Sequence, residues 1–258
     1  PLLQSVQKCI VGNSSAKAAV DMALWDLYGQ LYNIPVYKLL GGGRKQIVTD
    51  ITISVNDPDT MVSDSLKAVA RGYDCLKMKV GVNPELDVAR LSAVRNAVGK
   101  DIVIRIDANQ AWTPKQAVKI LNKMQELGLD IELVEQPVSA HDFAGLKYVT
   151  DRSYVPVLAD EAVFSPENAM TILQMGAADL INIKLMKCGG IYNALKIASA
   201  AEVFGVECTI FARDLSAAWF GDAREYYSVG DRVLVRVQEI SGEDVEHLSI
   251  RADIRSTF

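Results

Sequence analysis

Two apolar patterns alternate along this chain. Short apolar runs of five or six residues are rich in valine and isoleucine, and the longer stretches between them carry apolar residues at helical spacing. The alternation repeats at roughly 25 residues, the size of one strand plus one helix. The predicted strands cover 51–55, 75–80, 102–107, 131–136, 155–160, 180–185 and 206–210.

Two of the helical stretches carry start signals. Asn13 and the two serines after it are typical of a helix N-terminus, and apolar residues at helical spacing follow from Ala19 to Leu31. Thr113 is a candidate cap for a second helix, because Pro114 then falls at the first helical position, where proline is tolerated. Among the other stretches, helices are predicted over 114–127 and 191–204.

The order of these elements indicates the fold class. Apolar strands that alternate with helices imply a parallel sheet whose faces are both covered, as in α/β proteins. Seven such strands favour a TIM-type (β/α)8 barrel, although periodicity alone also permits a doubly wound open sheet. We therefore predict an α/β barrel, with its last strands the least complete part.

Charged residues end five of the predicted strands. Lys77 and Lys79 lie two apart, so both point to the same face of their strand. The active sites of parallel barrels lie at the carboxyl ends of the strands. Because the charges recur every 24 to 28 residues, we expect them to meet at that rim. The charges that follow the lysine pair along the chain are Asp107, Glu135, Asp160 and Lys184.

Three carboxylates from adjacent strands form an all-oxygen donor set. Such a set suits Mg²⁺, or Mn²⁺, and does not suit Zn²⁺, which favours nitrogen and sulfur ligands. Any one acidic residue after a strand could be a helix cap, but five charges in phase argue against a purely structural role. Glu161 should point away from Asp160 and is not counted as a ligand. Gly189 and Gly190 before a helix could seat a phosphate, but this signal is weak alone.

Composition excludes several classes of function. The 258 residues are 50% hydrophobic and carry a net charge of −5, which argues against a nucleic-acid partner. No apolar run is long enough to cross a membrane. Four widely spaced cysteines without a CxxC motif indicate free thiols in a reducing compartment, so we expect a cytoplasmic location.

The chain resembles the enolase superfamily in its muconate-lactonising subgroup, and within it the dipeptide epimerases of the L-Ala-D/L-Glu type. The resemblance covers about residues 10–210. It is carried by "KMKVG" (77–81), "RIDANQAW" (105–112), "VEQP" (134–137), "LADE" (158–161), "NIKLMKCGG" (182–190) and the opening helix "AKAAVDMALWDLYGQ" (16–30).

This resemblance implies a role for each site residue. Asp107, Glu135 and Asp160 would bind Mg²⁺, while Lys79 and Lys184 would be the paired acid and base. Lys77 would hold the substrate carboxylate, and Asn109 and Asn182 would be supporting groups.

The implied activity is a Mg²⁺-dependent epimerase or racemase. It would remove the proton α to a carboxylate in a small molecule, with a dipeptide such as Ala-Glu as the expected substrate. Muconate cycloisomerase and o-succinylbenzoate synthase use the same groups and remain alternatives. A further alternative is an inactive remnant or binding protein. A homo-oligomer is compatible with the sequence.

The chain departs from the family pattern at both ends. It starts almost at the barrel, so we expect the N-terminal capping domain to be absent. After Ile210 the expected Gly-Ser…Glu and Asp-x-Asp segments are not found. Residues 1–210 contain 15 lysines and 6 arginines, whereas 211–258 contain 6 arginines and no lysine. We therefore predict a barrel domain over 1–210 with strands one to seven, and a divergent segment over 211–258 with a candidate eighth strand at 232–240. Dipeptide turnover by this chain should be poor or absent.

Overall fold

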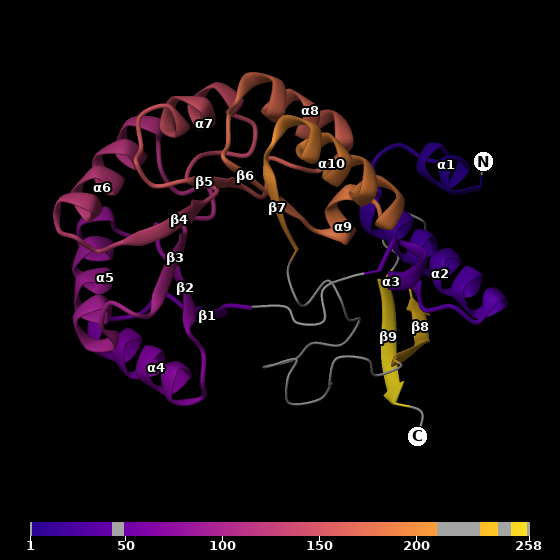
Figure 1. Cartoon of the computed structure of the whole chain (residues 1–258), viewed down its shortest axis with the longest axis horizontal. Coiled ribbons are helices and arrows are strands. Elements are labelled where there is room, and N and C mark those ends of the chain that lie inside the picture. The colour runs from indigo at the N-terminus through magenta and orange to yellow at the C-terminus, as the bar shows by residue number, and fades with distance from the viewer. Residues whose placement is uncertain (1, 43–48, 211–232, 242–248, 257–258) are drawn as a thin grey trace.

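A curved sheet of seven parallel strands forms the centre of the molecule. The structure, a computed structural model, describes residues 2–42, 49–210, 233–241 and 249–256. Figure 1 shows the strands along the inside of an arc and the helices along its outside. The strands are β1 (Ile51–Ile53), β2 (Cys75–Lys79), β3 (Val103–Asp107), β4 (Ile131–Glu135), β5 (Val157–Ala159), β6 (Leu180–Ile183) and β7 (Glu207–Ile210).

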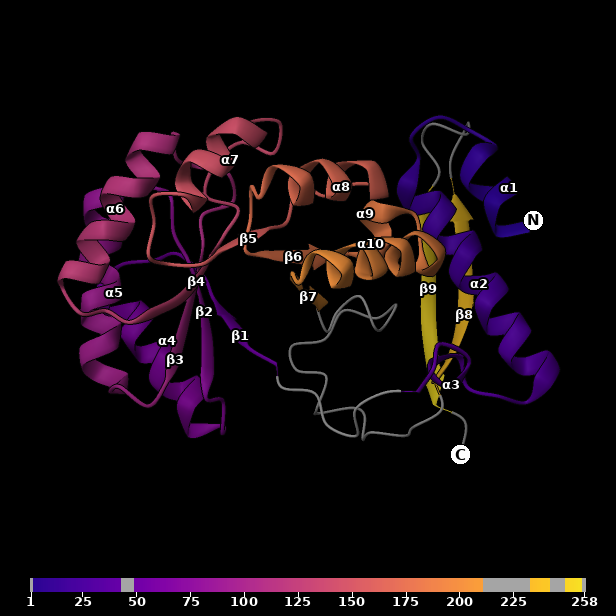
Figure 2. The same ribbon diagram turned by 45° about the horizontal axis from the view of Figure 1, so that its top comes forward.

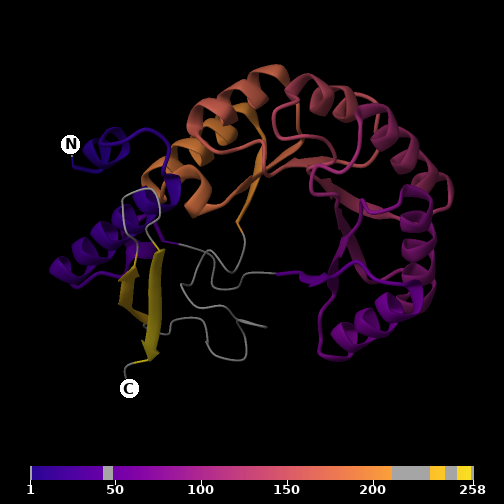
Figure 3. The same ribbon diagram turned by 180° about the vertical axis from the view of Figure 1, so that it is seen from behind.

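Helices follow the strands around the arc, as the view from behind in Figure 3 also shows. None of the helices in the described residues has the length and apolar character needed to cross a membrane. The helices are α1 (Leu2–Lys8), α2 (Ser14–Tyr32), α3 (Val36–Leu39), α4 (Pro58–Ala70), α5 (Pro84–Val98), α6 (Pro114–Glu126), α7 (Phe143–Thr150), α8 (Pro166–Met175), α9 (Leu185–Cys188) and α10 (Ile191–Phe204).

The strand order confirms a barrel-type arrangement. Each strand pairs in parallel with the next in sequence, from β1 at one edge to β7 at the other. A doubly wound sheet would reverse its order at a switch point, and this sheet has no reversal, so that alternative is excluded. The seven predicted strands are all present in one curled half-barrel.

The strand expected at 232–240 is found as β8 (Val233–Ser241). It pairs antiparallel with β9 (Ser249–Ser256), and the two form a sheet separate from the half-barrel. The rest of the predicted divergent segment, 211–232, lies outside the described residues.

Four of the outer helices begin with a capping residue followed by proline. The side chains of these residues accept hydrogen bonds from the backbone N–H groups of the first turn, and proline there loses no hydrogen bond. The four caps are Asp57, Asn83, Thr113 and Ser165. At α2 the predicted cap position is correct, but Asn13 has φ 50° and its amide donates to Val11 O, so its side chain does not cap the helix.

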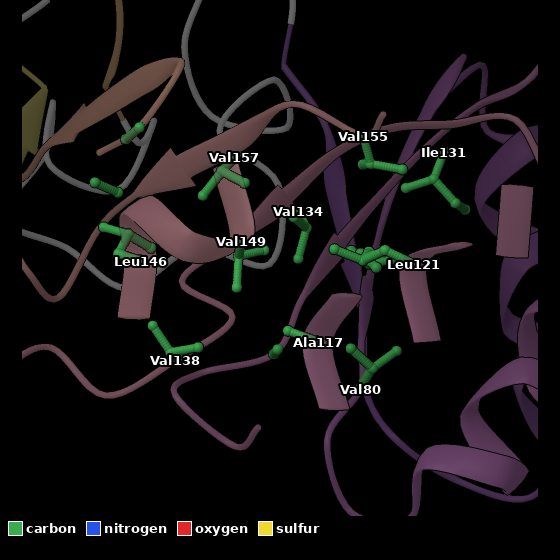
Figure 4. Packing of buried hydrophobic residues seen from close by; sticks show 14 of the residues in the cluster. Val80, Ala117, Leu121, Ile131, Val134, Val138, Leu146, Val149, Val155 and Val157 are labelled. Atoms are coloured by element: carbon green, nitrogen blue, oxygen red, sulfur yellow. The ribbon is translucent and has the colours of Figure 1, made fainter. Parts of the chain in front are cut away.

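The hydrophobic core lies between the strands and the outer helices. Leu76 and Met78 of β2 are fully buried on this side of the sheet. Figure 4 shows Val134 and Val157 of the strands near Leu121, Leu146 and Val149 of the helices. Since successive strand residues alternate, the lysines of β2 must face the inside of the arc.

A register shift in β4 changes which residues face inward. Ile104 of β3 pairs with Ile131, but Ile106 pairs with Val134, so β4 contains one extra residue. Glu132 and Glu135 therefore come to the same side of the sheet. There the carboxylate of Glu132 accepts a hydrogen bond from Arg105 Nε.

The N-terminal helices lie at the far end of the arc. Helix α2 packs against α9 and α10, which places the start of the chain beside the last helix of the half-barrel (Figure 2). Asp21 of α2 is buried, and its Oδ1 accepts the backbone N–H of Tyr192 at 3.3 Å.

Candidate active site

The charged residues predicted from the sequence meet at the carboxyl ends of β2 to β6. Lys79 pairs with Asp107 across β2 and β3, and Asp107 pairs with Glu135 across β3 and β4. Asp160 directly follows β5, and Lys184 directly follows β6. The parallel strands thus bring together residues that are more than a hundred positions apart.

Lys77 lies between two carboxylates in the buried part of the cluster. Its Nζ is 2.6 Å from Glu135 Oε2 and 3.0 Å from Asp107 Oδ2, and the residue is only 3% exposed. Burial opposes the charge on Lys77, but Glu135 and Asp107 outweigh it and raise the pKa of this ammonium group. Lys77 is therefore held as a permanent cation.

Lys79 reaches from the same strand toward the open side of the cluster. Its Nζ donates to Asp107 Oδ2 and to Asn109 Oδ1, both at 2.6 Å. The side chain is 31% exposed, far more than that of Lys77. Of the two lysines of β2, Lys79 is the one that a small molecule can reach.

The two carboxyl groups that follow differ in electrostatic state. Burial and the negative charge of Asp107 raise the pKa of Glu135 to about 7, although Lys77 acts in the opposite direction. Burial also disfavours ionised Asp160, but Lys187 and Lys184 outweigh it and hold the pKa of Asp160 below its ordinary value. Of these two groups, Glu135 is therefore the one whose ionised form is disfavoured, and Asp160 is the one whose ionised form is stabilised.

Lys184 and Asn182 complete the far side of the cluster. Lys184 Nζ lies 2.5 Å from Asp160 Oδ2. The buried amide of Asn182 donates to Glu135 Oε1 at 3.3 Å and to Asp160 Oδ1 at 3.2 Å. Its own oxygen is buried and has no hydrogen-bond partner among the described residues. In this position the oxygen can accept a hydrogen bond, or coordinate a cation, beside the carboxylates.

The donor set suits a hard divalent cation in its chemistry. It consists of carboxylate oxygens from Asp107, Glu135 and Asp160. Burial first, and then the negative charges of Asp107 and Asp160, raise the pKa of Glu135, and a cation would relieve that repulsion. In the structure, each of the three carboxylates accepts a hydrogen bond from a lysine ammonium group. No three His, Cys, Asp or Glu side chains in the described part of the chain form a ready-made metal-binding group.

Comparison with known proteins identifies the family. A family model described as enolase C-terminal domain-like matches residues 61–219, well over half of the chain. The chain belongs to the enolase superfamily. A second model, the N-terminal domain of mandelate racemase and muconate lactonizing enzymes, matches residues 1–41. The sequence alone assigned that segment to the barrel domain.

Several relatives of this enolase-superfamily chain are dipeptide epimerases. The L-Ala-D/L-Glu epimerase of Clostridium acetobutylicum is 58% identical over 209 residues, which are 81% of this chain and 58% of that protein. A substrate-liganded structure of the L-Ala-D/L-Glu epimerase of Bacillus subtilis matches with a TM-score of 0.79 and 50% identity. That match covers 81% of this chain and 58% of the other.

A third similar protein is the dipeptide epimerase of Enterococcus faecalis, solved in complex with Mg and the dipeptide L-Leu-L-Tyr. It matches with a TM-score of 0.77 and 46% identity, over 81% of this chain and 60% of that one. The chain thus spans somewhat more than half the length of the relatives it matches.

Lys187 is a member of the cluster that sequence reasoning missed. Its buried Nζ lies 2.5 Å from Asp160 Oδ1 and also donates to Asp160 O. Burial lowers the pKa of Lys187, although Asp160 acts in the opposite direction. Its position three residues after Lys184 was the available signal in the sequence. Helix α9 begins directly after β6, and residues three apart on a helix share a face.

Two further residues near Asp160 were not predicted from the sequence to belong to the site. Gln136 is fully buried with φ 36°, and its Oε1 accepts the backbone N–H groups of Asp160 and Ala162. Glu161, expected to point away from Asp160, reaches the edge of the cluster instead. Its Oε1 accepts a hydrogen bond from Asn109 Nδ2 at 3.0 Å.

The glycine pair before α10 does not form an anion site. A Cβ atom at Gly190 would lie 2.5 Å from the carboxyl group of Asp21. The N-terminus of α10 is therefore already occupied by a carboxylate of α2, which would repel a phosphate.

Proposed function

We propose that this chain carries the proton-transfer machinery of a dipeptide epimerase. The observation that supports this most directly is the position of two lysines on opposite sides of the carboxylates. Lys79 contacts Asp107 at one side, and Lys184 contacts Asp160 at the other. In strand order they flank the three elements that carry the carboxylates. A substrate over the carboxylates would have one lysine facing each side of its α-carbon.

The chemistry assigned to the lysines is a transfer of one proton in each direction. One lysine, neutral at that moment, takes the α-proton onto Nζ, and the electron pair of the C–H bond moves into the substrate carboxylate. The other lysine, protonated, donates a proton to the opposite face of the planar carbon. The configuration inverts, and the two lysines exchange protonation states.

We propose that Asp107, Glu135 and Asp160 hold a divalent cation, Mg²⁺ in preference to Mn²⁺. Such an ion stabilises the negative charge that develops on the substrate oxygens when the α-proton leaves. The Lys77 cation, buried next to Asp107 and Glu135, would attract the substrate carboxylate through its charge rather than by direct contact. Asn182 would keep the Glu135 and Asp160 carboxylates apart at a fixed spacing.

The proposed substrate is a dipeptide such as Ala-Glu. The names of the relatives described above specify dipeptides, and up to 58% of the aligned residues of this chain are identical to theirs. We also propose a cytoplasmic location, since all four cysteines are free thiols. The domain division, 1–210 and 211–258, remains a proposal supported by the end of the parallel sheet at Ile210.

The test is exchange of the α-proton with solvent. The purified chain is incubated with L-Ala-L-Glu and Mg²⁺ in D₂O, and deuterium incorporation and epimerisation are followed by NMR. We expect both at a low rate for the wild-type chain, and we expect neither Lys79→Ala nor Lys184→Ala to epimerise, because each lacks one of the two proton-transfer groups.

Each single variant should still exchange the α-proton of one stereoisomer through its remaining lysine. Full epimerisation by either variant would exclude the two-base mechanism. A wild-type chain that binds the dipeptide without exchange would favour the alternative of an inactive remnant. Turnover of muconolactone or of an o-succinylbenzoate precursor, without turnover of dipeptides, would favour the other members of the subgroup.

A further inference from the structure

Glu161 occupies a backbone position that is fixed on both sides. The backbone N–H groups of Asp160 and Ala162 both donate to Gln136 Oε1, at 2.9 Å and 3.1 Å. Gln136 is itself fully buried, and its Nε2 donates to Val138 O at 3.0 Å. The side chain of Glu161 therefore starts from a rigid segment rather than from a loose surface loop.

Its carboxylate binds the side chain of Asn109. Asn109 is exposed, but it is held at three points. Its backbone N–H donates to Asp107 Oδ1 at 3.0 Å, its Nδ2 donates to Glu161 Oε1 at 3.0 Å, and its Oδ1 accepts from Lys79 Nζ at 2.6 Å. Without the contact to Glu161, the carboxamide would be held by Lys79 alone, and its nitrogen would turn to water.

The orientation of this carboxamide follows from the chemistry of its two neighbours. The ammonium group of Lys79 is a donor only, and the ionised carboxylate of Glu161 is an acceptor only. The amide satisfies both in one orientation alone, with its oxygen toward Lys79 and its nitrogen toward Glu161. Glu161 thus stabilises the orientation in which Asn109 presents an acceptor to Lys79.

That acceptor in turn restricts the direction of the lysine nitrogen. Two of the three N–H directions of Lys79 are taken by Asp107 Oδ2 and Asn109 Oδ1. Nζ is tetrahedral, so its bond to Cε and these two contacts determine the fourth direction. This is the direction in which a proton would be taken from, or given to, a substrate.

The second carboxylate oxygen of Glu161 indicates that this residue has a role beyond a structural tie. Oε2 is buried and has no hydrogen-bond partner among the described residues. A buried polar atom without a partner destabilises the fold, and such a cost is tolerated where the group has a task. A glutamate that served only to tie two loops together would gain from satisfying both of its oxygens.

We propose that Glu161 is a positioning residue for Lys79, acting through the carboxamide of Asn109. The inference rests on the proposed function, because it assigns Lys79 a proton-transfer role at one face of the substrate. It predicts that loss of the acceptor at position 161 impairs one of the two proton transfers and leaves the other unchanged.

The test compares two substitutions of nearly equal size in the full chain. Glu161→Gln keeps an oxygen that can accept from Asn109, whereas Glu161→Leu removes it. Hydrogen–deuterium exchange is measured separately for L-Ala-L-Glu and L-Ala-D-Glu with Mg²⁺ present, and the isomer that depends on Lys79 is identified from Lys79→Ala. We expect Glu161→Leu to slow exchange of that isomer about 10-fold and the other isomer less than twofold. Glu161→Gln should restore exchange to within about threefold of wild type.

A second readout does not require catalysis. The ¹⁵N-ammonium NMR signal of Lys79, assigned from its loss in Lys79→Arg, should be visible in wild type and in Glu161→Gln, because two acceptors slow its exchange with water. It should shift or broaden in Glu161→Leu. If the wild type exchanges neither isomer, the proposed function fails and this signal alone decides the positioning role. Equal loss at both faces, equal effects of the two substitutions, or an unchanged ammonium signal in Glu161→Leu would overturn the proposal.

Discussion

Glu135 stands out among the acidic residues of the cluster because burial and neighbouring carboxylates raise its pKa to about 7. In an unfolded chain the same group ionises near its ordinary value of 4.5. The folded state therefore binds this proton more tightly than the unfolded state does. Stability from this group is complete below about pH 4.5, and it is lost as the pH rises through about 7.

The first prediction concerns this pH dependence. In the metal-free chain, wild type should lose up to about 3 kcal/mol of unfolding free energy between pH 5 and pH 8 relative to Glu135→Gln, whose amide does not ionise. Urea denaturation of both proteins across this range measures the difference in slope. Parallel profiles would show that Glu135 is ionised at ordinary pH and that its neighbours compensate its charge fully.

Prediction from sequence succeeded for residues whose direction follows from strand alternation. Lys77, Lys79 and Asp107 lie within or at the end of strands, so counting by two places them on one face. Prediction from sequence failed for residues that follow the end of a strand. Lys187 lies one helical turn beyond Lys184, and the alternation of strand residues does not predict the direction of a side chain in the following helix. The contact of Glu161 with Asn109 was not predicted either, because the backbone after Asp160 is shaped by Gln136, which belongs to another segment.

At the level of elements, the turn after β2 depends on a glycine. Gly81 has φ +108°, a conformation that favours glycine, and a Cβ atom there would lie 2.4 Å from Ala111 Cβ. Its N–H also donates to Asp87 Oδ2 at 2.7 Å, at the start of α5. This turn sits two residues beyond Lys79 and ties the end of β2 to the segment that follows β3.

The second prediction uses a matched pair of glycines. Gly72 also has positive φ, at +90°, but a Cβ atom there meets nothing within 4 Å. Gly72→Ala therefore measures backbone strain alone, while Gly81→Ala adds a steric clash. We expect Gly81→Ala to lower the unfolding free energy by about 2 kcal/mol more than Gly72→Ala does. Chemical denaturation of both variants is the measurement, and equal losses would show that the turn relaxes without strain.

The register of β4 shows a limit of sequence reasoning at this scale. Strict alternation places Ile131, Leu133 and Glu135 on one face, and it assigns Glu132 to the other. The extra residue in the pairing with β3 instead brings Glu132 to the side of Glu135, where it meets Arg105. A bulge depends on pairing between two strands, so the pattern of one strand does not reveal it. The helix starts were easier, because Thr113 and Gln116 form a local capping box.

At the scale of the whole molecule, the proposed metal site joins three successive strand ends. A cation bound by Asp107, Glu135 and Asp160 would bind the folded chain and not the unfolded one. The third prediction is that Mg²⁺ raises the melting temperature, by an amount equivalent to about 2.7 kcal/mol at a concentration 100 times its dissociation constant.

Glu135→Gln is the control for that titration, since it keeps the size of the side chain and removes its charge. Its melting temperature should respond to Mg²⁺ much less than that of wild type. An equal response of both proteins would mean that the ion binds elsewhere. A response of neither would mean that the lysine contacts leave no room for an ion at the carboxylates.

The sequential strand order has a consequence for how such a site can be inherited. Every side chain of the cluster described above comes from one uninterrupted stretch, Lys77 to Lys187, in which each unit pairs with the next. Recombination events that exchange the flanking segments would leave the spacing of these groups intact. They would alter only what surrounds a bound molecule. We therefore expect chimeras joined outside 77–187 to retain this cluster while the residues around a bound molecule change.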